Sequence, residues 1–205
     1  MKSIAFLSQK GGSGKTTLAV HIAVAAHEAG QRVVVVDTDP QRSATTWGNA
    51  REAAAPLVAS AAVSDLARVL DAAKTEAMTL VLIDTAPHAA PEAAAVARAS
   101  DFVLIPCRPT AFDLAAAGNA AAIVKAARAP AAFVLSACPF RAPEIGETRA
   151  ALADYGLQVA TPEITDRRAF ARAIASGRAV TEFEADGRAA EEIRALWTWL
   201  EDQLR

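Results

Sequence analysis

The stretch with the clearest chemical use lies near the start of the chain, at residues 7–17, LSQKGGSGKTT. Its glycines, Gly11, Gly12 and Gly14, have no Cβ atom, so successive backbone N–H groups can turn inward around one anion. The stretch ends in Gly-Lys-Thr, as loops that hold nucleotide phosphates do. The usual pattern has a glycine where this chain has Gln9. We therefore predict a phosphate-binding loop of an unusual kind.

The side chains of this loop complement its backbone. Lys15 would place a positive charge on the terminal phosphates, and Thr16 would offer its hydroxyl to Mg²⁺. A second lysine, Lys10, stands five residues earlier, among the glycines. The residues expected to bind the nucleotide are Gly11, Gly12, Ser13, Gly14, Lys15, Thr16 and Thr17.

Three aspartates follow apolar runs that resemble strands. Asp84 ends LVLID (80–84), where an acidic group often holds Mg²⁺ through water, and it would act with Thr16 as a metal ligand. Asp37 and Asp39 lie in VVDTDPQ, where Asp37 would support the metal and Asp39 would orient an attacking water. The alternatives are a helix-capping role for Asp84 and turn formation by the other two, since Asp-Pro favours turns.

The hydrophobic pattern predicts the elements that must position these residues. Short apolar, often β-branched runs indicate strands at 3–7, 33–37, 80–84, 102–106 and 132–136. Helical patterns occupy 16–30, 43–55, 65–74, 90–99, 111–128, 143–155, 167–176 and 188–204. This alternation predicts a single α/β domain over 1–205, with a mostly parallel twisted sheet and helices on both faces, and no N-terminal DNA-reading module. Ligands of such sheets bind beyond the carboxyl ends of the strands.

Composition limits where the protein acts. No run approaches the roughly 18 apolar residues of a membrane span, and the N-terminal apolar run is too short for a signal peptide, so we expect a cytoplasmic protein. The net charge of −2 means that any contact with nucleic acid must come from a local basic patch.

The motifs KGGSGKTT, DTDPQ and LIDTAP, in this order, resemble the deviant Walker A ATPases of the ParA/MinD family. The segment FVLIPCRPTAFDLAAAG (102–118) is similar to that of small plasmid-type, ParF-like members. The resemblance implies a P-loop NTPase fold that binds ATP and Mg²⁺ and hydrolyses ATP slowly. It also implies an ATP-dependent homodimer in which Lys10 reaches the partner subunit's ATP, Asp39 activates water, and a ParB-like or adaptor protein stimulates hydrolysis.

Members of this family differ in what the dimer binds. The segment ITDRRAFARAIASGRAV (164–180) carries four arginines and one aspartate. Family resemblance places nonspecific DNA contacts in this region, which predicts a partition or cargo-positioning protein associated with the nucleoid in its ATP state. The expected DNA contacts are Arg167, Arg168, Arg172 and Arg178. An ordinary solvated arginine face is the alternative.

Two other functions remain open at this point. A MinD-like protein would bind membrane through its last helix, but residues 191–205 carry more acidic than basic side chains, so we expect that helix to pack on the sheet and predict no membrane contact. A metabolic P-loop enzyme, a small-molecule kinase or ligase, is disfavoured by Lys10 and DTDPQ. Adenine is expected near the backbone of Ala137 to Phe140, with Pro139 against the ring.

Overall fold

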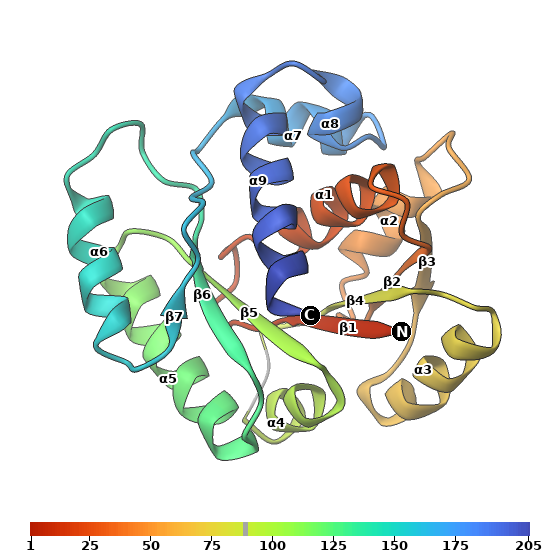
Figure 1. The fold of residues 1–205 in the computed structure, drawn as a ribbon, viewed down its shortest axis with the longest axis horizontal. Coiled ribbons are helices and arrows are strands. Elements are labelled where there is room, and N and C mark those ends of the chain that lie inside the picture. Colours follow the sequence, from red (N-terminus) through yellow and green to blue (C-terminus); the bar gives the residue numbers. More distant parts are fainter. Residues whose placement is uncertain (88–89) are drawn as a thin grey trace.

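Parallel strands form the centre of the molecule (Figure 1). The computed structural model describes residues 1–87 and 90–205. Within these residues one sheet of seven strands has the order β3-β2-β4-β1-β5-β6-β7, and every strand pair in it is parallel. The strands are β1 (Lys2–Phe6), β2 (Val33–Asp37), β3 (Leu57–Ser60), β4 (Leu80–Asp84), β5 (Phe102–Cys107), β6 (Ala131–Leu135) and β7 (Gln158–Val159).

Helices cover both faces of this sheet (Figure 1). One apolar core joins one face of the strands to α1 (Lys15–Glu28), α2 (Ser43–Asn49), α7 (Arg168–Ala175), α8 (Val180–Phe183) and α9 (Arg188–Gln203). The other core joins the opposite face to α3 (Leu66–Thr75), which follows the 3₁₀ turn η1 (Val63–Asp65), and to α4 (Ala90–Ala99), α5 (Ala111–Ala127) and α6 (Glu144–Ala153). The predicted fold class is confirmed.

The central strands read as continuous apolar runs because neither face meets water. All five residues of β2 and all five of β4 are buried. The strand pairing aligns Asp84 with Asp37 on one side and with Phe6, which precedes the glycine loop, on the other. The sheet therefore brings the loop and both acidic strand ends to the same edge.

Three short elements and one helix boundary differ from the sequence prediction. The pattern did not indicate β3, β7 or α8, because β3 is an edge strand of partly exposed residues, β7 has two residues and α8 has four. The helix expected over 43–55 ends at Asn49. Beyond it, Arg51 turns toward Glu182, with Nη2 donating to Oε1 at 2.8 Å.

The C-terminal helix packs against the domain, as expected. Ile193, Leu196, Trp197 and Leu200 of α9 are buried in the core that contains α1. The apolar stripe of α9 is thus occupied by protein contacts. Across the described residues, no helix combines the length and the apolar character that crossing a bilayer requires.

A histidine in α1 makes stability sensitive to acid. His21 is fully buried, its Nδ1 accepts from the Val180 N–H at 3.1 Å, and burial lowers its pKa to about 3. The unfolded chain would take up the proton near pH 6.5 while the folded chain would not, so stability is complete above pH 6.5 and is lost as pH falls toward 3. We expect this histidine to lower the free energy of unfolding by about 1.4 kcal/mol per pH unit in that window.

Urea unfolding of the wild type and of His21→Leu at pH 7, 6, 5 and 4 measures this loss. The difference in unfolding free energy between the two proteins should shift steadily in favour of the variant as pH falls. His27→Leu is the control, because His27 lies on the same helix but is exposed. A pH profile of His21→Leu parallel to that of the wild type would contradict the assignment.

Candidate functional site

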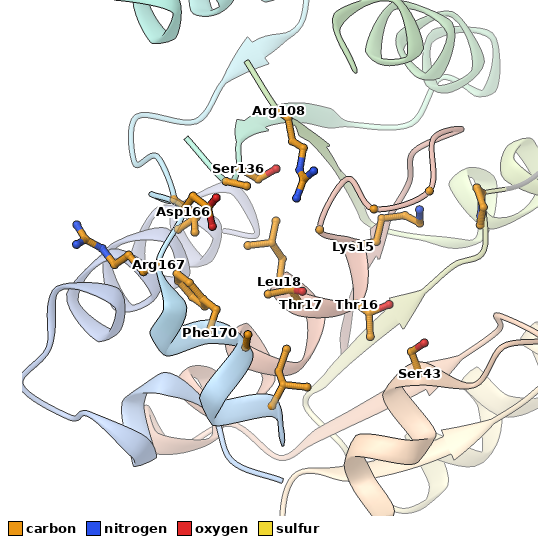
Figure 2. Close-up of a pocket in the computed structure, with 18 of the residues that line it drawn as sticks. Lys15, Thr16, Thr17, Leu18, Ser43, Arg108, Ser136, Asp166, Arg167 and Phe170 are labelled. Atoms are coloured by element: carbon orange, nitrogen blue, oxygen red, sulfur yellow. The ribbon is translucent and has the colours of Figure 1, made fainter. Parts of the chain in front are cut away.

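A cavity of about 590 Å³ opens at the carboxyl edge of the sheet, between the glycine loop and α7 (Figure 2). The loop after β1 forms one wall, and the segments after β6 and β7, with α7, form the other. Of the seven loop residues predicted to bind a nucleotide, six line this cavity: Gly11, Gly12, Gly14, Lys15, Thr16 and Thr17. Ser13 is buried beneath them, and its carbonyl accepts from Ser136 Oγ at 2.8 Å.

The backbone of the loop is shaped for an anion. Gly12 and Gly14 have φ angles of 74° and 100°, which residues with a Cβ atom rarely adopt. Gly14 is also the N-cap of α1, and no side chain caps this helix end. The first N–H groups of α1 therefore point into the cavity without an intrahelical acceptor, and the helix dipole adds to their attraction for a phosphate.

Lys15 lies within this cradle. Its side chain is largely buried, and its Nζ donates to the Lys10 carbonyl at 3.3 Å. Burial lowers the pKa of Lys15, while the nearby Asp84 and Asp39 carboxylates oppose that shift. A buried ammonium group beside a ring of N–H donors matches the charge of a nucleotide's terminal phosphates.

Asp84 provides the test of whether a metal fits here. Its carboxylate is fully buried, and neither oxygen accepts a hydrogen bond among the described residues. Burial raises the pKa of Asp84 to about 7; the nearby Thr16 hydroxyl, which lies close enough to interact without meeting hydrogen-bond geometry, opposes this rise, and the Asp37 carboxylate adds to it. Oxygen ligands without other partners, next to the Thr16 hydroxyl, are the donor set that Mg²⁺ prefers. The residues present therefore fit the ion that the sequence predicted.

The other two aspartates differ in what they contact. Both oxygens of Asp37 are engaged: Oδ1 accepts from the Asp39 N–H at 3.1 Å, and Oδ2 accepts from the N–H and hydroxyl of Thr45, each at 2.8 Å. This geometry favours the turn-forming alternative for Asp37. Asp39 lines the cavity, and only its Oδ1 is used, by the Gln41 N–H at 2.8 Å. Asp39 is thus placed to accept a proton from a water in the cavity.

Lys10 is held within its own chain. Its ammonium group donates to Asp113 Oδ2, and that carboxylate also accepts from the Thr110 hydroxyl at 2.5 Å. Asp113 is almost completely buried near the start of α5, whereas 39% of the Lys10 side chain is exposed. The ion pair joins the glycine loop to the segment after β5.

The far end of the cavity is apolar and was only partly foreseen. Ala137, which was predicted near the base, lines it, but Pro139 does not appear among its lining residues in the described chain. Ile164, Phe170 and Ile174 supply most of the apolar wall. Sequence reasoning missed this wall because β7, which leads into it, is too short to leave a pattern.

An acidic residue of α9 holds this wall in place. Glu192 accepts from the N–H and hydroxyl of Thr165 at 3.0 and 2.8 Å, and from Arg167 Nη2 at 2.7 Å. Arg167 therefore lies at the cavity, paired with Glu192. The other three arginines of the predicted patch, Arg168, Arg172 and Arg178, are exposed.

The fold and the site together define a P-loop nucleotide-binding protein: a parallel sheet with a glycine loop that leads into a helix N-terminus, a buried lysine, and an unpartnered aspartate on the neighbouring strand. The chain belongs to a particular family of this class. Residues 4–180 match the model of the CobQ/CobB/MinD/ParA nucleotide-binding domain. The resemblance to ParA/MinD proteins is thereby confirmed.

Curated relatives are partition and positioning proteins. The chain is 41% identical over 114 residues to the "Maintenance of carboxysome distribution protein A" of Gloeobacter kilaueensis; this match covers 55% of the chain and about half (51%) of that relative. It is 27% identical to the "Protein ParA" of Rhizobium radiobacter, over 83% of the chain and 81% of the relative. The septum site-determining protein MinD of Pyrococcus horikoshii, solved with Mg-ADP, shares the fold with a TM-score of 0.80 at 17% identity, covering 98% of this chain and 96% of that one.

Proposed function

We propose that this chain is an Mg-ATP-dependent dimerisation switch. In its ATP state it would bind DNA nonspecifically and partition plasmid or chromosomal DNA or position a protein cargo. The observation that carries the proposal is the cavity, which the glycine loop and Asp39 line. The unpartnered Asp84 carboxylate is buried next to Thr16 and Lys15 of that lining, and Lys10 belongs to the same loop. The names of the curated relatives support the partitioning or positioning role.

The residues at the cavity would have separate roles in ATP binding and hydrolysis. The N–H groups of Gly11–Thr17 and Lys15 would hold the phosphates, and Thr16 and Asp84 would hold Mg²⁺, which neutralises charge on the transferred phosphoryl group. Asp39 would orient the attacking water and accept its proton. A single carboxylate of this kind, partly exposed and already bonded to the Gln41 N–H, is consistent with slow turnover that a ParB-like or adaptor protein stimulates.

The switch requires that ATP stabilise the dimer more than the separate subunits. Lys10 supplies a reason for such a difference. In one chain its ammonium group is paired with Asp113, and in the dimer it would leave this pair for the phosphates of the partner's ATP. Hydrolysis would remove that anionic contact, so the dimer would separate.

DNA binding would come from the exposed arginines at the start of α7 and after it. Arg168 and Arg172 lie one helical turn apart and share a face. Arg172 and Arg178 both lie near the Phe183 ring, at 5.2 and 6.0 Å from its centre. A dimer would double this patch, which lets a chain of net charge −2 bind phosphates without reading bases. In this state the protein would lie on the nucleoid in the cytoplasm.

Replacing Asp39 with Ala tests the catalytic part of the proposal. We expect ATP turnover to fall about 100-fold or more, because a positioned general base contributes this much, while ATP binding persists. Phosphate release and nucleotide titration measure the two quantities. Asp71→Ala, on α3 away from the cavity, is the control. Turnover of Asp39→Ala equal to that of the wild type would show that another group orients the water.

Membrane positioning is the second candidate, since MinD-like proteins share the fold. The structure disfavours it, because the apolar stripe of α9 is buried in the core. Parallel assays separate the two functions: a gel shift with random-sequence DNA and pelleting with anionic liposomes, each with and without ATP. A metabolic enzyme would instead show turnover that depends on an added acceptor molecule.

A further inference from the structure

Besides Lys15 and Arg167, one further cationic residue of the described chain lines the cavity. Arg108 follows β5 directly and lines the cavity. Figure 2 shows its guanidinium group pointing into the cavity, between Ser136 and the glycine loop. Sequence reasoning did not single it out, because an isolated arginine after a strand carries no pattern.

Arg108 differs from the two partly exposed cations of this edge, Lys10 and Arg167, in having no ion-pair partner among the described residues. Lys10 is paired with Asp113, and Arg167 is paired with Glu192. Within residues 1–87 and 90–205, no oxygen accepts a hydrogen bond from the Arg108 guanidinium, and no aromatic ring lies against it. A guanidinium group is charged at every physiological pH and presents several N–H donors in one plane, which suits two oxygens of a phosphate.

The backbone holds Arg108 at a fixed place. The carbonyl of the preceding Cys107 accepts from the Ser136 N–H at 2.9 Å, and the carbonyl of Arg108 accepts from the Thr110 N–H at 2.7 Å. The first bond ties the end of β5 to the end of β6. The side chain therefore projects from a fixed strand end, so binding a ligand would order the side chain but not the backbone.

The order of the strands in the sheet indicates which part of a bound nucleotide Arg108 would face. At the metal end, Asp39 follows β2 and Asp84 is the last residue of β4, while the apolar wall at the base end lies beyond β6. The loop follows β1, and β5 lies between β1 and β6. Arg108 is thus on the base side of the loop and away from the metal, where the middle of a bound nucleotide would pass.

We propose that Arg108 binds the inner phosphates, the α- and β-phosphates, of the nucleotide held in its own subunit. The inference rests on the proposed nucleotide binding and adds a residue to it. The two cations would then have different roles. Lys10 would distinguish ATP from ADP, because it would bind the phosphates of the partner subunit's ATP. Arg108 would bind ATP and ADP equally, because both nucleotides have the inner phosphates.

Titration calorimetry with Mg-ADP and with Mg-ATP tests the assignment in the wild type, Arg108→Ala and Arg108→Lys. Loss of an exposed charge-assisted contact should raise the Kd of both nucleotides about tenfold in Arg108→Ala. Arg108→Lys should keep part of the affinity, because lysine retains the charge but not the planar donors. In steady-state assays of Arg108→Ala, KM should rise while kcat stays within about twofold, the signature of uniform binding.

Arg141→Ala is the matched control, because Arg141 is an exposed arginine of the next loop whose guanidinium group lies 5.0 Å from the centre of the Phe140 ring. It should bind both nucleotides like the wild type. Unchanged ADP affinity in Arg108→Ala would overturn the proposal, and so would a loss confined to ATP, which would place the side chain at the terminal phosphate. Failure of the wild type to bind either nucleotide would instead refute the proposed function.

Discussion

Replacing Lys10 with Ala should abolish the ATP-dependent dimer while leaving ATP binding by the single chain largely intact. A charge-assisted hydrogen bond contributes about 1.5–3 kcal/mol, and the pair with Asp113 that each lysine gives up offsets up to about 1 kcal/mol of this. A symmetric dimer would lose this difference twice, so the dimer Kd should rise about 100-fold. Lys15 and the loop backbone, which hold the phosphates within one subunit, are unchanged by this substitution. Light scattering with and without ATP measures the dimer, and nucleotide titration measures binding.

Lys74→Ala is the matched control for this experiment. Lys74 is also a lysine paired with one aspartate, Asp71, at 3.1 Å, but it lies on α3. It should dimerise like the wild type. If Lys10→Ala still dimerises with ATP, the lysine has no cross-subunit role, and its pairing with Asp113 is then its function. A melting temperature equal to that of the wild type would show that the substitution has not acted through folding.

Replacing both Arg168 and Arg172 with Glu should remove ATP-dependent DNA binding without changing ATP turnover. Each substitution replaces a charge that attracts phosphate with one that repels it, and the dimer would carry four such changes. We expect the apparent Kd for random-sequence duplex DNA to rise at least tenfold at about 0.1 M salt, and the dependence of binding on salt to become weaker. Gel shifts at several salt concentrations measure both effects.

Charge reversal elsewhere on the molecule controls for net charge. Arg68→Glu with Lys74→Glu makes the same change on α3, which covers the opposite face of the sheet. That variant should lose only a small part of the DNA affinity. Retained binding in the Arg168 and Arg172 variant would locate the DNA surface elsewhere, whereas equal losses in both variants would mean that net charge, and not α7, governs binding.

Much of the candidate site was readable from the sequence because its signals are local. The glycines and lysines of the loop lie close together in the chain. A β-branched run that ends in an acidic residue predicts a buried strand with a carboxylate at its end. The rule that ligands bind beyond the carboxyl ends of parallel strands then places the loop, Asp39 and Asp84 together. In the structure the loop and Asp39 line one cavity at this edge, and Asp84 is buried beside Thr16 and Lys15 of that lining.

Contacts between distant segments were beyond the reach of the sequence. Arg167 and Arg168 are neighbours with the same side chain, yet Arg167 pairs with Glu192 at the cavity while Arg168 is exposed. Asp37 and Asp39 belong to one motif, yet Thr45 engages the first and the cavity receives the second. A residue pattern does not indicate which of two similar side chains contacts a partner elsewhere in the chain, whether eight residues away, as for Asp37 and Thr45, or 25, as for Arg167 and Glu192.

The sequence by itself determined the fold class, the phosphate-binding loop and the family, because periodicity, glycine spacing and strand-end aspartates depend on residues that are close along the chain. Only the tertiary structure decided that Asp113 holds Lys10, that α9 holds the apolar wall through Glu192, and that Arg108 lines the cavity. These depend on how the strand ends and helices pack in three dimensions, where burial and charge select one partner among many.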